Sequence, residues 1–83
     1  MADTYRNKIV TAYNSFRLYP PYQTINDEVN GVIYQRWSTN DEEETLISKI
    51  VMDEDVVITY TQTFAFDLWE NRESADYIYL IQN

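Results

Sequence analysis

Cysteine and histidine are both missing from this 83-residue sequence, which also has only one glycine and two prolines. Without cysteine there is no disulfide, no thiolate metal ligand and no thiol nucleophile. Without histidine the commonest general base near neutral pH is absent, so acyl-transfer triads are excluded. One glycine cannot build a dinucleotide fingerprint or a phosphate-cradling loop, because the backbone approaches the phosphate through several glycines. The sequence therefore predicts a protein that is not an enzyme and holds no cofactor.

Carboxylates alone offer two further kinds of site. A glycosidase-like pair needs a cleft deep enough to raise one pKa, and a chain of 83 residues leaves little depth for one. The acidic runs at residues 41–44 and 53–55 lack the alternating ligands, central glycine and distal glutamate of a calcium loop. We therefore predict no catalytic pair and no dedicated metal site.

Long apolar runs are missing as well. No segment approaches the ~18 apolar residues of a membrane span, and the N-terminal MADTYRNKIV lacks the apolar stretch of a signal peptide. Small secreted proteins usually carry disulfides, so the lack of cysteine favours a cytoplasmic location and no membrane partner. Aromatic residues make up 16% of the chain, which indicates one packed domain over residues 1–83 rather than disorder.

An amphipathic helix is predicted near the N-terminus, over about residues 4–18. Tyr5, Ile9, Tyr13 and Phe16 recur at spacings of four, four and three, which places them in one apolar stripe. The double proline that follows prevents the helix from continuing, because proline has no amide hydrogen to donate. We expect the stripe to pack on a sheet.

After a linker at residues 19–27 the sequence becomes typical of strands. Its β-branched and aromatic residues predict strands over about residues 29–37, 45–52, 56–66 and 76–81. Alternation is clearest in residues 56–66, for which we expect one buried and one solvated face. Short connections favour antiparallel neighbours, so we predict an α+β fold with the N-terminal helix packed on a four-stranded antiparallel β-meander.

Basic residues are scarce: 6 Lys and Arg stand against 14 Asp and Glu, for a net charge of −8. Residues 1–26 hold one acid and three bases, whereas residues 27–83 hold thirteen acids and three bases. The negative charge therefore lies on the predicted sheet and its turns. Because phosphate binding needs a surplus of Lys and Arg, direct binding of nucleic acid is disfavoured and a basic protein surface is the expected partner.

The meander order predicts where the acids meet. Its first and third turns share one end of the sheet, so the 41–44 run should lie near Glu70, Glu73 and Asp76, with the 53–55 run at the opposite end near Asp27 and Glu28. Interfaces also use aromatic anchors, and Trp69 or Tyr22 fits that role. The predicted partner-binding residues are Asp41, Glu42, Glu43, Glu44, Asp53, Glu54, Asp55, Glu70 and Glu73, with Trp69 and Tyr22.

In size, acidity and lack of catalytic groups, the chain looks like the nucleic-acid-mimicking inhibitors that phages make against host defence nucleases. These include some anti-CRISPR proteins and inhibitors of restriction or repair enzymes. The resemblance is compositional and covers no motif, so it transfers no residue. It implies an inhibitor that occupies a basic, nucleic-acid-binding surface by imitating phosphates. Immunity proteins that neutralise nuclease toxins share the same profile.

Two other interpretations stay open. Acids in exposed turns keep a domain soluble and protect strand edges, which is enough to produce this pattern. An exposed sheet edge can also pair with the same edge of a second copy, and the apolar segment YIYLI near the C-terminus favours such pairing. The chain would then be a homodimeric structural module.

Overall fold

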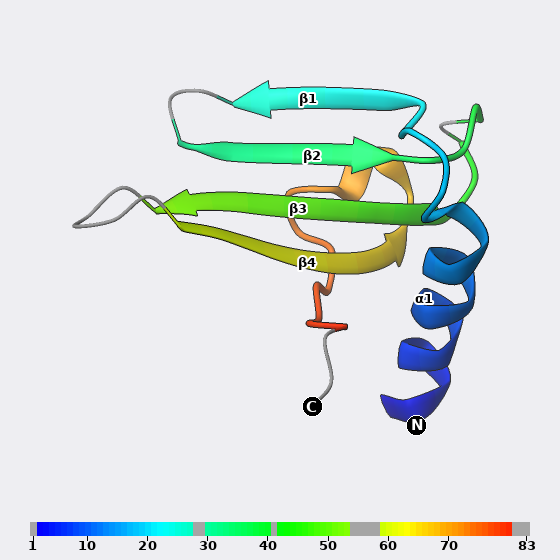
Figure 1. The fold of residues 1–83 in the computed structure, drawn as a ribbon. Coiled ribbons are helices and arrows are strands. Elements are labelled where there is room, and N and C mark those ends of the chain that lie inside the picture. The colour runs from blue at the N-terminus through cyan, green and yellow to red at the C-terminus, as the bar shows by residue number, and fades with distance from the viewer. Residues whose placement is uncertain (1, 28–29, 41, 54–58, 81–83) are drawn as a thin grey trace.

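The computed structural model describes residues 2–27, 30–40, 42–53 and 59–80. In this part of the chain one helix is followed by a four-stranded sheet and a short 3₁₀ helix (Figure 1). The elements are α1 (Ala2–Phe16), β1 (Gln23–Asp27), β2 (Val32–Arg36), β3 (Thr45–Asp53), β4 (Thr59–Asp67) and η1 (Trp69–Asn71). The strands lie in the order β1-β2-β3-β4 and each neighbouring pair is antiparallel. The predicted α+β fold, a helix packed on an antiparallel meander, is confirmed.

Helix α1 packs its apolar stripe on strands β3 and β4. Ile9 is fully buried against Leu46 and Phe64, because its position in the stripe faces the sheet. The helix ends at Phe16, two residues before the predicted boundary, where the amide of Tyr19 bonds the Phe16 carbonyl at 2.9 Å ahead of the double proline. No helix among the described residues is long and apolar enough to cross a membrane.

Strand β1 lies where the sequence predicted a linker, and the predicted strand at residues 29–37 shortens to β2. The two strands form a hairpin in which Asp27 pairs with Val32. The connection contains Asn30 and Gly31, and Gly31 has a φ of 66°, which glycine adopts without steric cost. The Asp27 carboxylate accepts hydrogen bonds from the Asn30 amide at 3.2 Å and from its side chain at 2.8 Å. An Asn-Gly pair between alternating segments is a strong hairpin signal, and it marks a turn here rather than a strand interior.

The predicted strand at residues 76–81 is wrong. Over residues 76–80, which the structure describes, the chain makes a single bridge in which Phe64 and Ile78 exchange backbone hydrogen bonds of 2.9 and 2.8 Å. Tyr5 and Arg6 of α1 donate to other carbonyls of this segment, at 2.7 and 2.9 Å. Because helix side chains satisfy these carbonyls, the segment stays beside α1 instead of adding a strand to β4.

The core is divided between the two faces of the sheet. Its buried clusters are Ile9, Leu46 and Phe64 on the α1 face, and Tyr34, Ile47 and Trp69 on the other. Phe64 and Ala65 point to opposite faces of β4, yet both are buried. The expectation of one buried and one solvated face for residues 56–66 is therefore wrong at this end of β4. The reason is that η1, through Trp69, and Tyr77 further along the chain cover the face opposite α1 (Figure 1).

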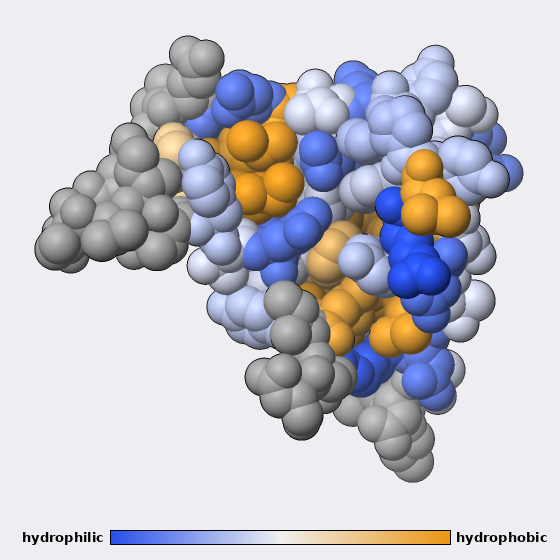
Figure 2. All heavy atoms as spheres, viewed as in Figure 1, coloured by the Kyte–Doolittle hydropathy of each residue, from blue (hydrophilic) through white to orange (hydrophobic). Residues whose placement is uncertain are grey.

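The two ends of the sheet differ in how well they are covered. At the covered end, where β2 and β4 finish, both faces carry packed side chains. Toward the open end, the α1 face has a hollow of about 380 Å³ whose lining includes Ile33, Met52 and Tyr60. Figure 2 shows apolar side chains exposed on this part of the face. The Tyr60 side chain is 65% exposed, so α1 shields only part of the sheet.

Candidate partner-binding surface

Carboxylates gather at the covered end of the sheet. The connection from β2 to β3 carries Glu42, Glu43 and Glu44, while Glu70 lies in η1 and Glu73 follows it, and all five side chains are exposed. We call these five residues the acidic surface. They share one end of the sheet because the connection starts where β2 finishes and η1 starts where β4 finishes. Asp41, which completes the predicted 41–44 run, lies outside the described residues.

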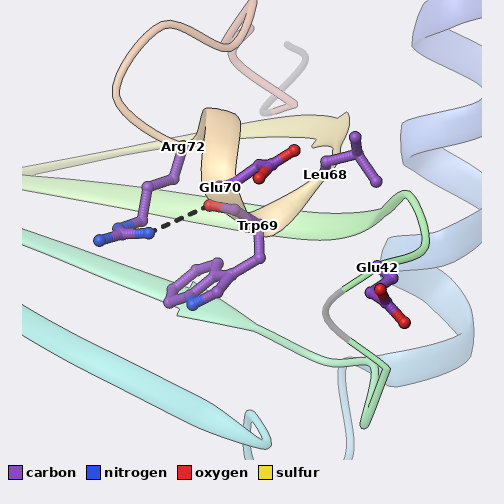
Figure 3. Close-up of a pocket in the computed structure, with 5 residues that line it drawn as sticks. All are labelled: Glu42, Leu68, Trp69, Glu70 and Arg72. Atoms are coloured by element: carbon purple, nitrogen blue, oxygen red, sulfur yellow. Dashed lines mark hydrogen bonds between the residues drawn. The ribbon is translucent and has the colours of Figure 1, made fainter.

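A hollow of about 430 Å³ joins the two acidic segments (Figure 3). It is lined by Glu42, Leu68, Trp69, Glu70 and Arg72. Figure 3 shows side chains from the β2–β3 connection and from η1 around the same space. Glu42 and Glu70 therefore lie close together, as the meander order predicts, although 28 positions separate them in the sequence.

The carboxylates of the acidic surface are unpaired: within the part of the chain that the structure describes, none of them forms a hydrogen bond or an ion pair. Asp67, which precedes η1, behaves differently. Its Oδ1 accepts from the Leu68 amide at 2.6 Å and from the Asn71 side chain at 3.0 Å. Asp67 therefore fixes the turn into η1, whereas the acidic surface keeps its charge free for solvent or a partner.

Most of the basic side chains in the described part of the chain contact aromatic rings or backbone carbonyls. The cations of Lys8, Arg36, Lys49 and Arg72 each lie over an aromatic ring, at 4.9 to 5.7 Å from the ring centroid. Arg6 donates to backbone carbonyls of the C-terminal segment instead. Contacts of this kind satisfy a cation without neutralising a carboxylate. Arg72 lines the same hollow as Glu42 and Glu70 and offsets part of their charge, so the five carboxylates of the acidic surface leave an excess of negative charge there.

Trp69 is not the exposed anchor that the sequence suggested. Its side chain is 5% exposed and packs with Tyr34 and Ile47 in the core on the face opposite α1. Arg72 lies over the indole at 5.0 Å and also donates from Nη1 to the Trp69 carbonyl at 3.2 Å (Figure 3). The Arg36 guanidinium lies 5.7 Å from the same ring. Trp69 is thus a core side chain that packs under the acidic surface, and it is too buried to contact a partner.

Tyr22, the other predicted anchor, is 58% exposed. Its ring lies over the guanidinium of Arg36, with 4.9 Å between the Cζ atom and the ring centroid. Arg36 is itself buried, and it donates from Nε and Nη2 to the Gln23 side-chain oxygen at 2.9 and 2.7 Å and from Nη1 to the Ser38 carbonyl. Sequence reasoning missed Arg36, because a lone arginine at the end of a strand carries no periodic signal that separates a buried position from an exposed one.

Three tyrosine hydroxyls near this end of the molecule have raised pKa values. Burial is the main cause of the raised pKa of Tyr5, Tyr34 and Tyr77. For Tyr5, the negative charges of Asp76, Asp67 and Glu44 raise the pKa further, while the hydrogen bond from the Phe66 amide lowers it. The carboxylates at residues 44 and 76 therefore act on one hydroxyl, which agrees with their predicted proximity.

The second predicted acidic group is only partly within the described residues. Asp53 ends β3 and Asp27 ends β1, so their backbones lie at the same open end of the sheet, as predicted. Glu54, Asp55 and Glu28 lie outside the described residues. Among the residues that are described, no three acidic side chains are grouped in a way that could hold a metal ion.

Sequence and structural comparisons give this site no precedent. No protein-family model, no curated protein and no solved structure matches the chain.

Proposed function

We propose that this chain is a non-catalytic acidic binding protein that covers a basic surface of a nucleic-acid-binding enzyme and inhibits it. In this proposal the carboxylates of the acidic surface take the place of phosphates. The chain would then belong to the class of phage-made inhibitors of host defence nucleases, which includes anti-CRISPR and anti-restriction proteins. The observation that carries the proposal is that the five carboxylates are exposed and unpaired within the described residues, while nearby bases contact rings or carbonyls.

Electrostatics supports a basic protein as the partner. Excess charge of one sign creates a potential that steers a complementary surface and raises its association rate, and nucleic-acid-binding grooves are rich in Lys and Arg. A chain of net charge −8 repels nucleic acid itself. A basic, phosphate-binding groove is therefore the surface that this potential attracts most strongly.

Hydrogen bonds from backbone amides to side chains support the same proposal, because they position the described part of the acidic connection before binding. The Asn40 side chain accepts from the Glu42 amide at 2.9 Å, and the Asn40 amide donates to Ser38 Oγ at 3.1 Å. The β3 strand that follows starts with the buried residues Thr45 and Leu46. A surface that is ordered in advance loses less entropy on association, which favours affinity.

The test compares two variants with the same charge change. One replaces Glu42, Glu43 and Glu44 with glutamine, and the other neutralises residues 53–55 with the matching amides, so both remove three charges from −8 and leave −5. Tagged wild-type and variant chains are incubated with cell lysate and washed at low and high salt, and the bound proteins are identified by mass spectrometry. The retained proteins are then challenged with DNA or RNA.

We expect the wild type and the 53–55 variant to retain a nucleic-acid enzyme that high salt or added DNA releases. The 42–44 variant should lose it, with an association rate at least ~10-fold lower. Equal retention by both variants, or a partner that nucleic acid does not displace, would contradict the proposal. A salt-insensitive homodimer with no recovered enzyme would favour the structural module instead.

A further inference from the structure

Four side chains at the covered end form an alternating series of cations and rings, Arg72, Trp69, Arg36 and Tyr22. Arg72 and Arg36 lie 5.0 and 5.7 Å from the Trp69 ring, and Arg36 lies 4.9 Å from the Tyr22 ring. Trp69 and Arg36 are buried at 5% and 4% exposure, whereas Tyr22 is 58% exposed. The middle of the series is therefore buried, and at one end it reaches a ring that is open to solvent.

Hydrogen bonds hold the backbone around Tyr22 in place. The Tyr22 amide donates to the Arg36 carbonyl at 2.7 Å, just before β1 begins. Upstream, the indole nitrogen of Trp37 donates to the Tyr19 carbonyl at 3.1 Å, which ties this segment to the start of the β2–β3 connection. Two prolines lie between Tyr19 and Tyr22 and fix their own φ angles. The ring thus stands ready for a contact beside the connection that carries Glu42, at little cost in entropy.

We propose that Tyr22 is a guanidinium-binding ring, and that an arginine of the basic partner stacks on its exposed surface while the glutamates of the acidic surface pair with neighbouring charges. The inference rests on the proposed function and names the side chain that the partner must supply. Arginine suits the ring better than lysine, because its guanidinium is planar and more weakly hydrated than an ammonium group. Trp69 shows within this molecule that one ring accommodates two guanidinium groups.

A nucleobase is the competing occupant, since bases also stack on exposed aromatic rings. The net charge of the chain argues against it. A strand that placed a base on this ring would bring its phosphates toward a chain of net charge −8. An arginine is attracted by the same net charge, so charge complementarity favours the guanidinium.

Two peptides of equal charge, nona-arginine and nona-lysine, test the inference on the full chain. Binding is measured by isothermal titration calorimetry at fixed salt for the wild type and for the variants Tyr22→Phe, Tyr22→Leu and Tyr60→Leu. We expect the wild type to bind nona-arginine about two- to fivefold more tightly than nona-lysine, the range of an exposed cation–π contact. Tyr22→Phe should keep this preference and Tyr22→Leu should lose it. Tyr60→Leu, which removes a tyrosine of similar exposure near the open end, should leave it unchanged.

The outcomes separate this inference from the proposed function. Equal affinity of the wild type for the two peptides, or an arginine preference that survives in Tyr22→Leu, overturns the inference. A glutamine variant of Glu42, Glu43 and Glu44 that loses both peptides then leaves the proposed function standing. If neither peptide binds the wild type, both fail. Thermal unfolding of each variant checks its fold, and a second variant without the ring, Tyr22→Gln, repeats the test where Tyr22→Leu is unstable.

Discussion

Replacing Trp69 with alanine tests whether this residue is a core side chain or a binding anchor. The indole is 5% exposed. A tryptophan buries about 200 Å², which at about 25 cal/mol per Å² corresponds to about 5 kcal/mol. Alanine retains part of this burial, and measured truncations of buried aromatic residues cost about 3–5 kcal/mol. A domain of this length has about 4–12 kcal/mol in total, so we expect Trp69→Ala to remove a large share of the stability.

Urea unfolding followed by circular dichroism measures the lost free energy of unfolding. In a separate thermal scan, the melting temperature should fall by more than ~12 °C. Tyr60→Ala is the control, because its side chain is 65% exposed and its loss should cost less than about 1 kcal/mol. A loss below about 1 kcal/mol for Trp69→Ala would refute the reasoning. In that case Trp69 would have to be free of the core and available as an anchor.

Two further predictions concern stability. Tyr5→Phe leaves the Phe66 amide and an Asp76 carbonyl without their partner, so we expect a loss of about 1–3 kcal/mol in urea unfolding. Stability should also fall as the pH rises above about 10. The pKa values of Tyr5 and Tyr77 are raised in the folded chain, so the unfolded chain releases the protons of these hydroxyls first. Full stability at high pH would contradict this assignment. Gly31→Ala should lower the free energy of unfolding by about 1–2 kcal/mol, because φ at this residue is 66°, and Gly31→Asn should lower it less. Equal losses in denaturant titrations would show that backbone strain is not the cause.

Local patterns were enough to predict the fold class and the covered face of the helix. The spacing of Tyr5, Ile9 and Phe16 placed all three on the buried side of α1, because helical periodicity depends on the sequence alone. The order of the strands also placed Glu42 near Glu70. Both successes needed only the sequence period and the geometry of a meander.

Long-range contacts decided the features that the sequence did not reveal. Residues 76–80 look like a strand, but bonds to Tyr5 and Arg6 hold their carbonyls beside α1. Asp67 and Glu70 flank Trp69 in the sequence, which made it a candidate anchor, but η1 turns its ring into the core. The hairpin at Asn30 and Gly31 is a different case: the predicted strand over residues 29–37 missed it, although its turn signal is local.

The uneven covering of the sheet has a consequence for how the molecule would be handled in the laboratory. Side chains packed on both faces hold the end that carries the acidic surface, so additions there would disturb the core and the charges together. Toward the opposite end, Tyr60 is 65% exposed and lines a hollow with the half-buried Ile33 and Met52. A cysteine introduced at Tyr60 would therefore be the only thiol in the chain, and it would carry a dye or a surface tether far from the proposed contact.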